Sequence, residues 1–184
     1  MADMKAKIEL DVAVENAQSM NALADQLHDV AKVLDGEMRQ AAQAAAQQLR
    51  ELAAQDAAIT TFRDLQADTA KSAQALKAAE RELANYSAQV GKGALATREQ
   101  ADALVRLQAA AKAAGDAHRG NNTALKDAGD ALTRVGISTK DTAAAQERLR
   151  AQVLQVRGAV QQLLPAYQGV AQGAGAAGAQ MERT

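Results

Sequence analysis

Two histidines are the residues of this sequence whose chemistry could serve a catalytic or metal site. His28 lies close to Asp25 and Asp29, and His118 lies among glycine and asparagine residues. A zinc site needs three or four ligands, and one histidine among helical carboxylates falls short of that number. No nucleophile lies at helical spacing from His118. We therefore interpret His28 as part of a solvated helix face, and His118 as a polar interruption or register marker in an apolar stripe.

Other patterns that could mark a binding site have simpler explanations. Gly91-Lys92-Gly93 is too short for a phosphate-binding loop and follows no strand, so it predicts a turn. Acidic residues such as Asp64 and Asp68 occur among Lys and Arg, as they do on ordinary helix surfaces. The sequence has no cysteine, which excludes disulfides, thiolate zinc sites and a cysteine nucleophile. We expect no enzyme activity, no cofactor and no metal.

The composition favours long helices with little bulk to bury. Of the 184 residues 48 are alanine, aromatic residues make up 2%, and there is one proline. Alanine is the best helix former, and a chain with one proline can form long uninterrupted helices. Large side chains supply most of the burial energy of a core, so a thick core is hard to build from this sequence. The composition predicts an all-α protein whose amphipathic, coiled-coil helices form elongated hairpins or a loose bundle.

The charges are balanced, with 21 Lys and Arg against 22 Asp and Glu. Nucleic-acid binding needs a basic surplus on one face, so we expect no nucleic-acid partner. No apolar run approaches the length of a membrane span, and the first ten residues lack the apolar centre of a secretion signal. We expect a protein that is made in the bacterial cytoplasm and does not insert stably into a membrane.

Spacing of the apolar residues divides the chain into segments. Charged and apolar residues alternate from Lys5 to Val14, which predicts a short strand that must pair with another strand, although a frayed helix start is an alternative. Beyond it, apolar residues recur at spacings of three and four, the pattern of a coiled coil. Thr97 with Gln100 is typical of a capping box, Gly136 of a helix end, and Ser138 or Thr139 of the next helix start. The expected order is a strand-like segment at 1–15, a helical region at 16–90 interrupted at Gly36, a turn at 91–97, a helix at 98–135 with a weak centre near 115–122, a turn at 136–139, a helix at 140–165 ended by Pro165, and a flexible Gly/Ala-rich tail at 166–184.

The larger residues of these apolar stripes are the candidate interaction residues. Each stripe is narrow, so it must be buried against another helix, either of the same chain or of a second copy in a homo-oligomer. The candidates are Leu23, Leu27, Val30, Leu34, Leu49, Leu52, Phe62, Leu65, Leu76, Leu83, Leu104, Leu107, Leu125, Leu132, Leu149, Val153, Val156 and Val160.

Two segments resemble passages of phage tail tape measure proteins. The first is ITTFRDLQADTA at residues 59–70, followed by an Ala/Gln/Lys-rich sequence at 73–89. The second is VGIST at residues 135–139, which leads into AAAQERLR at 143–150. Their order and separation are also similar to those of the family, so the chain resembles the N-terminal region of a tape measure protein.

This resemblance implies a structural protein of a phage or prophage virion. Proteins of this family set tail length during assembly, lie in the lumen of the tail tube, contact the tube subunits and the baseplate hub, and leave ahead of the DNA at infection. A helix rises about 1.5 Å per residue, so the number of residues sets the length of a helix, which would be at most about 280 Å for this chain. Because that length is short for such tails, we expect an N-terminal fragment or the product of a truncated reading frame.

Two other classes of function fit the same stripes. One is a bacterial coiled-coil scaffold or adaptor, unrelated to phage, that dimerises through them. The other is an amphipathic lipid-binding protein, which is weaker because the apolar faces lack the Trp, Phe and Lys-rich flanks that bilayers favour. Neighbouring genes for tail tube and baseplate proteins would favour the tape measure hypothesis, and their absence would favour the scaffold.

Overall fold

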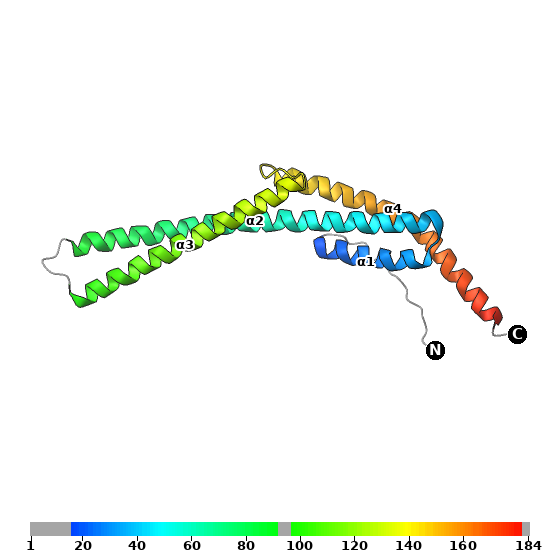
Figure 1. The fold of residues 1–184 in the computed structure, drawn as a ribbon, viewed down its shortest axis with the longest axis horizontal. Helices are drawn as coiled ribbons and strands as arrows, with labels where there is room; N and C mark the ends of the chain where they lie inside the picture. The colour runs from blue at the N-terminus through cyan, green and yellow to red at the C-terminus, as the bar shows by residue number, and fades with distance from the viewer. Residues whose placement is uncertain (1–15, 92–96, 182–184) are drawn as a thin grey trace. The chain divides into compact units, whose positions relative to one another are not determined.

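Four helices make up most of the described chain. The computed structural model describes residues 16–91 and 97–181 (Figure 1). Its helices are α1 (Ala17–Val33), α2 (Gly36–Val90), α3 (Arg98–Arg134) and α4 (Thr142–Met181), and these described ranges contain no strand. The predicted all-α class is confirmed. The predicted strand at 1–15 lies outside the described residues.

The chain divides into two compact units. The first consists of Met1–Ala57 and Lys140–Thr184, and its described part holds α1, the beginning of α2 and α4. We call it the three-helix unit. The second, Ala58–Thr139, holds the rest of α2 together with α3. We call it the hairpin unit.

In the three-helix unit, α1 is attached to α2 at both its ends. The carboxylate of Asp56 accepts a hydrogen bond from the backbone N–H of Ala17 (3.0 Å), the first residue of α1. A carboxylate stabilises this end of a helix because the free N–H groups there carry partial positive charge. At the other end, Gly36 has a φ of +55°, which a glycine adopts without strain. Arg39 donates from Nε to the carbonyl oxygen of Leu34 (2.7 Å), which holds this corner.

The core of the three-helix unit is made mostly of leucine, valine and alanine. Leu27, Leu34, Leu49 and Val160 are almost completely buried. Alanines such as Ala42 are also buried, because a methyl group lets neighbouring helices approach closely. From α4, Leu163 and Tyr167 pack against the cluster formed by Val30, Ala31, Leu34 and Ala42.

Two local sequence signals around α3 are confirmed. Thr97 and Gln100 form a capping box in which each side chain accepts from the other residue's backbone N–H. At the other end, Gly136 has a φ of +76° and donates to the carbonyl of Thr133, while Ile137 donates to that of Leu132. These two bonds satisfy carbonyls that the helix end leaves free.

The predicted start of the last helix was wrong by a few residues. Asp141, rather than Ser138 or Thr139, accepts from the N–H of Ala144 (2.9 Å), and the helix begins at Thr142. An aspartate is as good an N-cap as serine, and it also places negative charge at the helix start.

The prediction that Pro165 ends the last helix is also wrong. α4 continues through it to Met181, so most of the predicted tail at 166–184 is helical. Proline disrupts a helix by removing one N–H and crowding a carbonyl of the preceding turn. Here Pro165 is exposed, while Leu163 and Tyr167 on either side pack against the core. That packing and the alanine-rich sequence beyond favour helix on both sides of the proline.

A break near 115–122 does not occur either, because α3 runs through this region without interruption. Gly115 is buried, and a Cβ at this position would lie 3.8 Å from Leu76 Cδ1 on α2. Asn121 donates from Nδ2 to the carbonyl of Asp68 (3.3 Å). Contacts with α2 therefore hold residues that are weak helix formers on their own.

Gly120 offers a direct test of this explanation. Its missing Cβ would meet nothing within 4 Å, so Gly120→Ala should stabilise α3 by about 1 kcal/mol through helix propensity alone. Gly136→Ala should lower the stability by about 1–2 kcal/mol, because alanine is strained at a positive φ. Urea denaturation of both variants checks the pair, and a destabilised Gly120→Ala would contradict an unbroken α3.

Candidate functional site

The carboxylates beside His28 are paired with cations. Lys32 donates a hydrogen bond to Asp29 (2.7 Å), and this bond and the charge of Lys32 lower the pKa of the aspartate below its ordinary value. Arg50 of α2 donates to Asp25 (2.9 Å). His28 itself is exposed. Within residues 16–91 and 97–181 no group of three or more His, Cys, Asp or Glu side chains could hold a metal ion.

The apolar faces of the helices are therefore the candidate functional surfaces. Ten of the predicted interaction residues belong to the three-helix unit, and all ten are buried within the single chain. They are Leu23, Leu27, Val30, Leu34, Leu49, Leu52, Leu149, Val153, Val156 and Val160. Three helices thus bury all ten of these residues without a second chain.

The other eight belong to the hairpin unit, where burial is less complete. Phe62 and Leu132 are buried. The remaining six are half-buried, namely Leu65, Leu76, Leu83, Leu104, Leu107 and Leu125. Two helices can cover only the side of a stripe that faces the partner helix, so the flanks of these leucines stay open to solvent.

Some residues were assigned to the wrong environment by spacing alone. Met38 and Val135 have the three-four spacing of the stripes but are 47% and 50% exposed, because Met38 lies in the first turn of α2 and Val135 follows the last residue of α3. Ile59 was not predicted, although it is completely buried. Its distance of seven residues from Leu52 and three from Phe62 is the signal that could have identified it.

In the hairpin unit, α3 lies antiparallel alongside α2 (Figure 1). In the observed register, Phe62 lies opposite Gly129, Ser72 opposite His118, and Leu76 opposite Gly115. A Cβ on Gly129 would lie 3.4 Å from the ring of Phe62, the chain's single phenylalanine, which is an ordinary contact distance.

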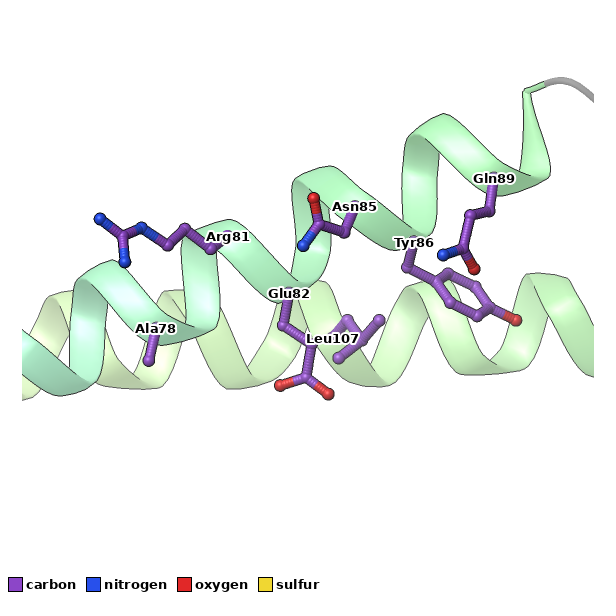
Figure 2. Close-up of a pocket in the computed structure, with 7 residues that line it drawn as sticks. All are labelled: Ala78, Arg81, Glu82, Asn85, Tyr86, Gln89 and Leu107. Carbon is purple, nitrogen blue, oxygen red and sulfur yellow. The ribbon is translucent and has the colours of Figure 1, made fainter.

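A groove of about 450 Å³ lies between α2 and α3 in the same unit (Figure 2). Leu107 is contributed by α3, and the other lining residues lie on α2: Ala78, Arg81, Glu82, Asn85, Tyr86 and Gln89. Apart from Leu107, Ala78 and the Tyr86 ring, the lining is polar. A small-molecule site is usually a mostly apolar cavity that encloses its ligand, so this groove better suits a side chain of a neighbouring helix.

Comparison with family models, with curated proteins and with solved structures finds no match for this chain. The helices that could be searched for a membrane span include none with the required length and hydropathy. The helix faces of the hairpin unit, with their half-buried leucines, are therefore the candidate site, and its chemistry is apolar packing against another helix.

Proposed function

We propose that this protein is a structural component of a phage or prophage tail, acting as the N-terminal region of a tape measure protein does. In this proposal it takes part in tail assembly and length determination by helix contacts inside the tail tube, with tube and baseplate hub proteins as partners. Support comes from the resemblance at residues 59–70 and 135–150. The first of these segments lies on α2 and includes the buried Ile59 and Phe62, and the second includes the turn before α4.

The half-buried leucines of the hairpin unit are the observation that carries the proposal. The three-helix unit shows that stripes of the same kind become fully buried when a third helix is present. The described part of the hairpin unit has only α2 and α3, and an exposed valine, Val105, adds to the apolar surface of α3. Burying such surface on a partner yields about 25 cal/mol per Å². A tube wall, a hub protein or a second copy could supply it.

α2 is the longest of the described helices. Its 55 residues span about 80 Å at the helical rise. We infer that a helix of this length supplies a fixed span, as a protein that measures length requires.

The functional proposal is tested by co-purification. The tagged chain is produced together with the tail tube protein encoded in the same genome, and we expect the two to purify as a complex. Leu83→Gln should weaken the complex about tenfold, because a half-buried apolar contact worth about 1.4 kcal/mol is removed. Lys77→Gln, at an exposed position of the same helix, is the matched control and should leave binding unchanged. Circular dichroism checks that both variants keep their helices.

The half-buried leucines also favour a second candidate, a bacterial coiled-coil scaffold or adaptor. A second copy of the chain would then cover them, as in a dimer of hairpins that forms a four-helix bundle. Light scattering after gel filtration separates the two candidates. A stable homodimer that fails to bind the tube protein would overturn the tail proposal and support the scaffold.

A further inference from the structure

A band of polar residues interrupts the apolar stripes of the hairpin unit. It consists of Thr69 and Ser72 on α2 and His118 and Asn121 on α3, all half-buried, and we call these four residues the polar layer. Ser72 Oγ lies 3.1 Å from Nδ1 of His118. Asn121 reaches the backbone of α2 at Asp68. The layer therefore joins the two helices by hydrogen bonds at the positions where their stripes lack leucine.

The hydrogen bonds assign a role to each atom around His118. The Ser72 hydroxyl donates to the carbonyl of Thr69 (2.9 Å), so its oxygen accepts from Nδ1–H of the histidine. Nε2 of the neutral ring then accepts from Nδ2 of Asn122 (3.0 Å). In the observed register, both ring nitrogens have a partner.

The apolar part of the stripes cannot select this register alone. Both stripes keep the same three-four spacing, so a slip of seven residues still places apolar residues opposite each other, for example Leu76 opposite Leu107 and Ala79 opposite Leu104. Such a slip would move His118 opposite Leu65 or Ala79, and Ser72 opposite Ala111 or Leu125. The two hydrogen bonds between the helices, Ser72 with His118 and Asn121 with the carbonyl of Asp68, would be broken, and their polar groups would face apolar side chains. This disfavours the slipped state by about tenfold per bond.

We propose that the polar layer sets the register in which α2 and α3 pair, and that it does so at a cost in stability. The cost is visible at Thr69, whose hydroxyl oxygen is buried and has no hydrogen-bond partner. Polar residues within coiled coils select one register in the same way while lowering stability. This inference concerns pairing within the hairpin and holds for either proposed function.

Engineered cysteines can report the register because the natural chain contains none. Ala79→Cys with Ala111→Cys brings two thiols together in the observed register. Ala79→Cys with Leu104→Cys does so only after a slip of seven residues. In the otherwise natural full-length chain, we expect the first pair to form a disulfide under mild oxidation, and the second to give about one percent of that yield.

The decisive variant replaces both sides of the layer, Ser72→Leu with His118→Leu. We expect the slipped cysteine pair to reach a yield within about threefold of the in-register pair, together with a higher melting temperature. Ser72→Ala with His118→Ala serves as a second variant of high helix propensity, with the same expected change in cross-linking.

Thr69→Val is the matched control. It removes a hydroxyl of the layer that makes no hydrogen bond and leaves the contact between Ser72 and His118 in place. We expect it to raise the melting temperature without any slipped disulfide. Exclusive in-register cross-linking in both double variants would overturn the proposal, as would slipped cross-linking in the natural background.

Discussion

Leu49→Ala is expected to lower the free energy of unfolding of the three-helix unit by about 3 kcal/mol. Leu49 lies on α2 and is 0% exposed. The substitution removes three buried carbon atoms and leaves a cavity that the surrounding helices can fill only in part. Small proteins have about 5–15 kcal/mol of stability in total, so a loss of this size is large. Urea denaturation followed by circular dichroism measures it.

Leu154→Ala is the matched control for this prediction. Leu154 belongs to the same unit on α4, but its side chain is 62% exposed. The same chemical change should therefore alter the free energy of unfolding by no more than about 0.5 kcal/mol. Equal losses in the two variants would show that the packing described for α2 is incorrect.

Phe62→Ala should destabilise the hairpin unit by about 3 kcal/mol, for the same physical reason. The Phe62 side chain is 7% exposed and packs over Gly129 of α3. Because Leu65, Leu76 and their neighbours are only half-buried, this ring is a major part of the apolar burial in the unit. Hydrogen exchange provides the measurement, and the backbone amides of α3 should exchange faster in the variant. Unchanged protection of α3 would contradict the prediction.

Gly129→Ala is a useful companion to Phe62→Ala. The added methyl group would meet the Phe62 ring at 3.4 Å and Thr139 at 3.5 Å, which are ordinary contact distances. Helix propensity then favours alanine by about 1 kcal/mol, so the single variant should be at least as stable as the natural chain. In the double variant Phe62→Ala with Gly129→Ala, the added methyl group no longer has the Phe62 ring to contact. The two effects should therefore not add, as is usual for residues in contact.

Comparison of the two units explains which interactions one chain can complete alone. Alanine contributes little transfer energy, yet it allows three helices to approach until Leu27, Leu34 and Leu49 are covered. The three-helix unit therefore closes a core although the sequence has few large side chains from which to build a thick one. In the hairpin unit the same type of stripe has one partner helix, and its leucines remain available to another chain.

The sequence by itself determined the features that depend on near neighbours along the chain. The capping box at Thr97, the left-handed Gly136 and the three-four stripes all follow from local hydrogen bonds, backbone sterics and helical periodicity. The all-α class follows from the same interactions, because alanine and its long-chain companions favour helix at nearly every position.

Where local helix preference and packing disagree, only the tertiary structure decided whether the helix continues. Gly115 and Pro165 both predict interruptions, but burial against α2 in one case and packing of the flanking Leu163 and Tyr167 in the other keep the helices continuous. The register of α2 against α3 was equally hidden, since a seven-residue repeat allows several alignments. The contact between Ser72 and His118 becomes apparent only once the two helices lie side by side, because it joins residues that are far apart in the chain.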